Sequence, residues 1–188
     1  MIKVNVTHIE RISQGDILRD VDYLEGVSEI EGNIEVIKIR FPLAIVLTQD
    51  CDLQQDDMFR KKASEGVLGN QDKYLLSVLV APLYNLEHVY TGEHLTDLGM
   101  KMTEIDRKST QGKNLKQNQI PRYHYLEFLQ DVPIVPSVID FKHYFSVDVL
   151  SLQKNHHTAF VCGVSELYRE DISQRFSSFL SRIGLPNA

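Results

Sequence analysis

Cys51 stands between two carboxylates, in the segment Asp50-Cys51-Asp52, directly after an apolar run that predicts a buried strand. Segments that follow buried strands commonly carry functional residues. A catalytic thiolate needs a positive neighbour or a helix N-terminus, and the two carboxylates work against it unless Arg40 or His124 lies beside the sulfur. The segment predicts either a Cys51-centred enzyme or thiol sensor, or a small half-buried residue at a strand end.

Asp50 and Asp52 are the candidates for a pair of metal ligands. If strand geometry continues through them, their side chains project to one side, because alternate residues of a strand share a face. Mg²⁺ would accept this pair but needs further oxygen ligands, which the sequence does not supply. Acidic residues that form a turn and cap the next segment are the alternative. We therefore expect no bound metal and no cofactor.

His124 alternates with Tyr123 and Tyr125, so on a strand it faces opposite to both tyrosines. An imidazole at this position could transfer protons near neutral pH, or it could be held by hydrogen bonds as a structural residue. Further along the chain, the adjacent residues His156 and His157 predict a solvated turn before a late strand.

A local excess of positive charge lies between residues 101 and 122, where six bases face two acids in an otherwise acidic chain. Such a stretch could follow the phosphates of an RNA, or it could be an ordinary solvated loop. It lacks interleaved aromatic side chains before Tyr123, which does not favour stacking on single-stranded bases. The six candidate nucleic-acid-binding residues are Lys101, Arg107, Lys108, Lys113, Lys116 and Arg122.

Composition is that of an ordinary globular protein. The chain has 188 residues, a hydrophobic fraction of 43%, a charged fraction of 24% and a net charge of −6. The length predicts one domain. No apolar run is long enough to predict a membrane span, and the charged first residues do not predict an export signal. Two distant cysteines predict neither a disulfide framework nor a zinc site, so we expect a cytoplasmic protein with no membrane partner.

The elements that must position these residues are mostly strands, with one long C-terminal helix. Apolar residues recur at helical spacing over 166–183, which predicts that helix. An acidic, polar stretch predicts loops over 25–33 and 50–73, and a polar insertion covers about 85–121. Predicted strands of the core lie within about 1–84 and 122–164, with the individual segments at 34–40, 41–49, 74–84, 122–129, 132–140, 141–152 and 158–164.

The order of landmarks resembles the PemK/MazF-like family of small SH3-like barrels, known mainly as toxin endoribonucleases. The resemblance covers about half of the chain. It rests on Gly15-Asp16-Ile17, Arg40-Phe41-Pro42, Leu79-Val80-Ala81-Pro82 and Val138-Ile139-Asp140, and on the amphipathic C-terminal helix. It implies a mainly β, α+β fold, a compact SH3-like barrel closed by that helix, and a tendency to dimerise.

The same resemblance implies a catalytic pair, an Arg before the Pro and a Thr or Ser at the end of the third strand. Arg40 matches the first position, but Tyr84 stands where the small hydroxyl is expected. A phenol with a pKa near 10 does not simply replace it beside a scissile phosphate.

Three functions follow from these patterns. The leading hypothesis is a cytoplasmic binding or accessory protein of a toxin–antitoxin, mobile-element or phage-defence system, acting as a homodimer or with a protein partner. The second is a metal-independent endoribonuclease in which Arg40 stabilises the charged transition state and His124 or Tyr84 handles the proton. The third is the Cys51-centred enzyme or sensor.

Overall fold

The computed structural model describes residues 1–7, 10–67, 70–130 and 132–182. Two compact units divide the chain, and each is assembled from segments that are distant in sequence. Unit 1 contains residues 1–3, 83–143 and 165 onward, and unit 2 contains residues 4–82 and 144–164. Strand β4, Ser77–Asn85, contributes its first residues to unit 2 and its last three to unit 1.

Hydrogen-bonded pairing joins eight strands of the described chain in the order β1-β8-β2-β3-β4-β6-β5, with β7 also paired to β4. Every strand–strand pair is antiparallel, and the order is not closed. The predicted mixture of a large antiparallel sheet with a few helices is confirmed, while the SH3-like barrel stays a prediction.

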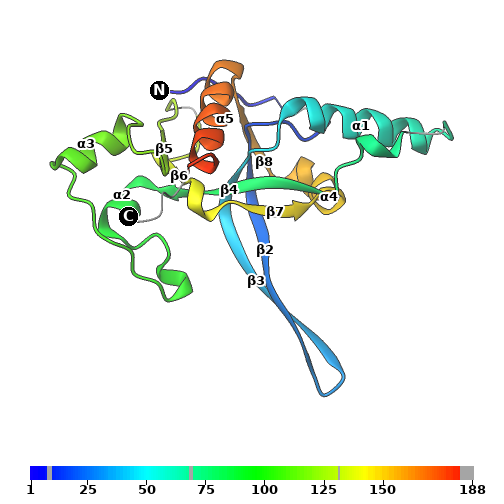
Figure 1. The fold of residues 1–188 in the computed structure, drawn as a ribbon, viewed down its shortest axis with the longest axis horizontal. Coiled ribbons are helices and arrows are strands. Elements are labelled where there is room, and N and C mark those ends of the chain that lie inside the picture. Colours follow the sequence, from blue (N-terminus) through cyan, green and yellow to red (C-terminus); the bar gives the residue numbers. More distant parts are fainter. Residues whose placement is uncertain (8–9, 68–69, 131, 183–188) are drawn as a thin grey trace, which may run out of the picture. The chain divides into compact units, whose positions relative to one another are not determined.

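Unit 2 holds the longest strands and a core of aliphatic side chains. Val46, Val80 and Leu18 are almost fully buried there, and Phe145 packs against Phe41 with the ring centroids 5.3 Å apart. The elements of unit 2 are β1 (Val4–Asn5), β2 (Asp16–Ile30), β3 (Asn33–Val46), α1 (Asp50–Ser64), the 3-10 helix η1 (Gln71–Lys73), β7 (Phe145–Asp148), α4 (Val149–Ala159) and β8 (Phe160–Val164) (Figure 1).

Unit 1 packs its C-terminal helix on a short sheet through aromatic rings. Phe141 is fully buried, with its ring centroid 5.5 Å from that of Phe176 and 6.0 Å from that of Phe179. The helix predicted over 166–183 is confirmed as Glu166–Leu180, and its last predicted residue lies outside the described residues. The elements are α2 (Leu86–Thr91), η2 (Thr96–Leu98), α3 (Thr110–Lys116), β5 (Tyr123–Leu126), β6 (Ser137–Asp140), η3 (Phe141–His143) and α5 (Glu166–Leu180).

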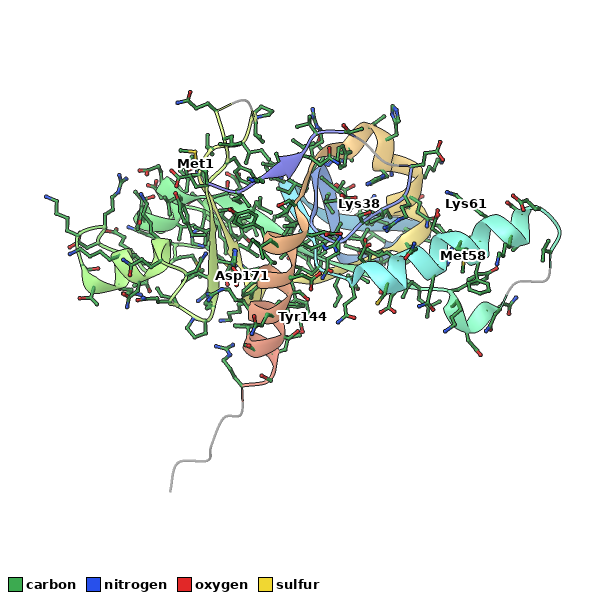
Figure 2. All side chains as sticks on the ribbon, turned by 90° about the horizontal axis from the view of Figure 1, so that it is seen from above. Met1, Lys38, Met58, Lys61, Tyr144 and Asp171 are labelled. Atoms are coloured by element: carbon green, nitrogen blue, oxygen red, sulfur yellow. The ribbon has the colours of Figure 1, made fainter. Side chains whose placement is uncertain are left out.

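Helix α1 replaces the loop predicted over 50–73, and a buried carboxylate holds it in place. Asp56 is 1% exposed and accepts hydrogen bonds from Arg60 Nε at 2.8 Å, the backbone N–H of Leu75 at 2.7 Å and Gln153 Nε2 at 3.2 Å. One side chain thus joins α1 to the segment before β4 and to α4. The other side of the helix is exposed, as Met58 and Lys61 show (Figure 2).

Helix α4 corrects two further expectations. The segment predicted as a strand over 141–152 contains η3, β7 and the start of α4, which Asp148 caps by accepting the N–H of Ser151 at 2.7 Å. His156, predicted in a solvated turn, is 3% exposed inside α4. Its Nε2 lies 2.9 Å from Asp16 Oδ2, and Asp16 also accepts the N–H of Ser13 at 2.8 Å. This buried pair attaches α4 to the start of β2.

Within the described part of the chain, no helix combines the length and the apolar character that crossing a bilayer requires.

Candidate functional site

A buried ion pair forms the centre of a polar cluster in unit 1. Asp140, at the end of β6, is fully buried, and Arg122 Nε donates to both of its carboxylate oxygens, at 2.8 and 3.0 Å. The backbone N–H of Lys142 donates to Asp140 Oδ1 at 3.0 Å. The hydrogen bond that Arg122 donates to Asp140, together with the negative charge of that carboxylate, raises the pKa of Arg122 above its ordinary value. Arg122 thus makes a charge-assisted, two-point contact with Asp140, and its predicted role as a phosphate ligand stays a prediction.

His143 extends this cluster to Tyr84. Its Nδ1 lies 3.4 Å from Asp140 Oδ2 and 3.1 Å from the hydroxyl oxygen of Tyr84. The cluster arises because Tyr84 pairs with Val138 in the β4–β6 register and therefore shares a face with Asp140, two residues along β6. The 3-10 turn η3 then returns the chain so that His143 approaches both groups.

His94 completes the cluster by packing its ring on Tyr84, with the centroids 4.9 Å apart. Both ring nitrogens of His94 are buried, and neither makes a hydrogen bond with the described residues. Burial lowers the pKa of His94. The nearby backbone of His88 acts in the opposite direction but does not outweigh the burial. Burial likewise lowers the pKa of His143 and, together with the charge of Asp140, raises that of Tyr84.

At pH 7 the cluster therefore holds neutral imidazoles and a neutral phenol around the ion pair of Arg122 and Asp140. Such groups can donate and accept hydrogen bonds, but a phenol with a raised pKa is a poor base or nucleophile. Among the described residues, no group of three or more acidic, histidine or cysteine side chains could hold a metal ion. The residues fit a structural network better than a reaction centre.

His124 does not belong to this cluster. It pairs with Ile139 on β6, whereas Tyr84 pairs with Val138, so the two side chains lie on opposite faces of the same sheet. His124 is 3% exposed, and burial lowers its pKa to about 3, with the nearby charge of Arg175 contributing. The carboxylate of Asp171 on α5 (Figure 2) is 4.0 Å away and more than half exposed, too distant to offset the burial.

Burial of neutral His124 is expected to make stability depend on pH. Because the folded-state pKa is about 3 and the ordinary value is 6.5, the unfolded chain binds this proton first as the pH falls. The free energy of unfolding should therefore decrease between pH 6.5 and 3, by up to about 1.4 kcal/mol per pH unit. Urea unfolding at a series of pH values should show a shallower dependence for His124→Phe than for the wild type, and no such difference for the exposed control His157→Gln. Equal slopes for the wild type and His124→Phe would contradict the burial argument.

The acidic motif around Cys51 starts helix α1 in unit 2. Cys51 is exposed in the first turn, where its sulfur lies 3.7 Å from Gln49 Oε1 and from Asp52 Oδ1. Asp50 makes a two-point ion pair with Arg11, at 3.0 and 2.9 Å, and accepts the backbone N–H of Gln14 at 3.2 Å. The predicted strand end at Cys51 is wrong. Asp50 and Asp52 lie in the first turn of a helix, so the strand geometry that their shared side required is not present, and neighbours two apart on a helix diverge.

Arg40 lies on β3 in unit 2 with 65% of its side chain exposed. Its Nε and a terminal nitrogen donate to the two carboxylate oxygens of Asp22, at 2.7 and 3.1 Å, and this contact raises its pKa. Lys38 approaches the same carboxylate at 3.7 Å, so two bases share one acid. The side chain that Arg40 contacts is therefore the carboxylate of Asp22, and not the imidazole or phenol that the ribonuclease hypothesis names.

Most of the predicted basic residues are exposed on unit 1, as expected for a solvated surface. Two of them form ion pairs, Lys101 with Glu104 at 3.4 Å and Arg107 with Glu87. Helix α3 carries others, and the Lys116 ammonium lies 5.8 Å from the centroid of the Tyr125 ring. The exposed members of the set are Lys101, Arg107, Lys108, Lys113 and Lys116.

The sequence patterns do not predict one exposed apolar feature of unit 2, the outer half of a long hairpin. Residues 24–38, here called the arm, form the outer half of the β2–β3 hairpin, and all of them are exposed except half-buried Gly26. Figure 1 shows the two strands running past the other strands of their unit to a turn. The turn is Glu31-Gly32, with φ of 53° and 79°, the positive values that a tight two-residue hairpin turn demands. The exposed large apolar side chains of the arm are Leu24, Val27, Ile30, Ile34, Val36 and Ile37.

A hollow of about 380 Å³ lies at the base of the arm, within unit 2. Its lining includes the apolar side chains of Val21, Val147 and Leu152 and charged groups such as Arg19 and Asp20. Asp20 adopts a φ of 56° inside β2, a conformation that non-glycine residues rarely take.

The comparisons with known proteins point to no relative: no family model, no curated protein and no solved structure matches the chain.

Proposed function

We propose that this protein acts by binding another protein through the arm, residues 24–38. The observation that carries this proposal is the exposure of six large aliphatic side chains on one two-stranded element, from 48% for Val36 to 74% for Ile34. Scattered exposed aliphatic residues are ordinary on a protein surface, but a contiguous group on a protruding element marks an interaction site. An accessory role in a toxin–antitoxin, mobile-element or phage-defence system would fit such a binding protein.

Energetics support a partner for the arm. Fully burying a Val, Leu or Ile side chain contributes about 1.5–3 kcal/mol. Covering the exposed half of six such side chains would therefore contribute about 5–9 kcal/mol of hydrophobic free energy. An isolated two-stranded hairpin is only marginally stable in water. A bound partner would stabilise the arm and gain this burial.

The backbone of the arm supports the same conclusion. β2 pairs with β8 only over Asp16–Leu18, and β3 pairs with β4 only over Ala44–Val46. Beyond these short segments, no other strand of the described residues pairs with the outer edges of the hairpin. Unpaired strand edges that carry apolar side chains recruit further chains, unless charge or proline prevents it. Binding through the arm is therefore the function best supported by the geometry.

Site-specific photocrosslinking tests the proposal. A photoreactive phenylalanine analogue at Val36 is expected to give one recurrent protein adduct in the source cells, because this side chain would lie inside the interface. The same analogue at Leu150 on α4, which is 54% exposed in the same unit, is the matched control and should not give that adduct. Mass spectrometry identifies the adduct.

A second substitution shows whether the apolar side chains are responsible. Val27 lies opposite Val36 in the hairpin register, so Val27→Lys should remove the adduct without changing the circular dichroism spectrum. The absence of an adduct from Val36, or equal adducts from Val36 and Leu150, would contradict the proposed function.

A further inference from the structure

One face of the arm gathers most of its exposed apolar side chains. Directly paired residues of an antiparallel hairpin point to the same face, and the register pairs Val27 with Val36 and Glu29 with Ile34. Glu25 is an extra residue in β2, a β-bulge, so Leu24 and Val27 point to the same face although they are three residues apart. Leu24 lies opposite Lys38 in the register. We call Leu24, Val27, Ile34 and Val36 the valine face. Their exposed fractions are 54%, 62%, 74% and 48%.

Charges at the two ends of the valine face have opposite signs. Lys38 and Arg40 lie at its base and share the carboxylate of Asp22, and Asp20 also lies near Arg40. Lys38 is the base that adjoins the valine face, since it pairs directly with Leu24. Glu29 lies on the same face near the turn. The distal segment, residues 25–35, contains four glutamates and no base. The face therefore carries a lysine at its base, apolar side chains in the middle and a glutamate near its tip.

This order of charges is complementary to itself when one copy is reversed. A two-fold axis through the Val27–Val36 pair places the tip of one arm over the base of another, so that Glu29 of each copy meets Lys38 of the other. Two valine faces then cover each other, and both pairs of charges are attractive. A face with one sign of charge throughout would repel its own copy.

We propose that the occupant of the arm is a second copy of this chain, packed valine face to valine face in antiparallel orientation. The proposal rests on the proposed function and names its partner. Four aliphatic side chains cover on the order of a few hundred Å², less than the roughly 800 Å² per partner of a standard interface. The dimer should therefore dissociate on dilution.

Charge reversal followed by mixing tests the arrangement. Glu29→Lys places two lysines against each other in the dimer, and Lys38→Glu places two glutamates against each other. Each variant alone should dimerise about tenfold more weakly than the wild type, because two attractive pairs become repulsive. An equimolar mixture should form a heterodimer of near wild-type affinity, since both pairs are again opposite in sign. Analytical ultracentrifugation over a wide dilution range measures all three.

Glu35→Lys is the matched control, because Glu35 carries the same charge on the opposite face of the arm. It should leave dimerisation unchanged. A wild type that is monomeric at millimolar concentration, a mixture that stays monomeric, or equal weakening by Glu35→Lys would overturn the proposal. If the wild type is monomeric while Val36 crosslinks to a different protein, the second-copy inference alone fails and binding through the arm stands.

Discussion

Replacing Asp140 by alanine is expected to lower the free energy of unfolding by about 3–5 kcal/mol, the cost of breaking a buried ion pair by removing one partner. Asp140 is fully buried and accepts hydrogen bonds from Arg122 and from the backbone of Lys142. Alanine would leave a guanidinium that is 26% exposed without its carboxylate. Urea unfolding followed by circular dichroism measures the loss.

Two controls separate a structural cluster from a general sensitivity of unit 1. Glu104→Ala removes an exposed carboxylate that pairs with Lys101 and should change stability by less than about 0.5 kcal/mol. Arg122→Ala should be nearly as harmful as Asp140→Ala, because it leaves the same carboxylate buried without its main partner. A change below about 1 kcal/mol for Asp140→Ala would show that water or another group replaces the ion pair.

Asp56→Ala is expected to destabilise unit 2 by a similar amount, about 3–5 kcal/mol. The carboxylate of Asp56 is 1% exposed and receives hydrogen bonds from Arg60, Leu75 and Gln153. These donors come from three different segments, so their loss should loosen α1 as a whole. Hydrogen exchange should show faster exchange of the α1 amides in addition to a lower unfolding midpoint in urea.

Its matched control is the next residue. Asp57, whose side chain is 20% exposed, pairs with Lys61 at 3.0 Å on the same helix, and a helical pair of this spacing contributes only about 0.3–0.5 kcal/mol. Asp57→Ala therefore changes the same type of residue at almost the same place with little expected effect. Equal destabilisation by both substitutions would show that α1 depends on its net charge and not on the buried contacts of Asp56.

Helix α5 could be predicted because its apolar residues recur at helical spacing and mark a single face. Helix α1 could not be predicted in the same way, since it buries only Leu53 and Asp56. The available signal was charge, because Asp56–Arg60 and Asp57–Lys61 are both spaced four apart, as helical ion pairs require. The acidic run predicts a loop, and this prediction is wrong, since residues 50–64 form a helix.

The arm is a second element that the sequence patterns do not predict. Its β2 half was predicted as a loop because it is rich in glutamate and glycine, but these residues form a regular hairpin with a two-residue turn. Alternation predicts a strand with one buried face. It does not distinguish such a strand from one whose apolar side chains lack a covering layer within the described chain.

The polar cluster of unit 1 was predicted only in fragments. Tyr84 and Arg122 were singled out for different reasons, and nothing in their spacing joins them to His94, His143 or Asp140. Their proximity comes from the register of β4, β6 and β5, which a single sequence does not encode locally. Arg40 and His124 were also singled out, and the structure gives each of them other neighbours.

The division of the chain into interleaved segments has a consequence for its synthesis on the ribosome. Unit 2 lacks β7, α4 and β8 until translation has passed Val164, and unit 1 lacks α5 until translation has passed Leu180. The arm, by contrast, belongs to the first quarter of the chain. A nascent polypeptide therefore displays this apolar hairpin before either core can close, and two neighbouring ribosomes on one message could bring two arms together during translation.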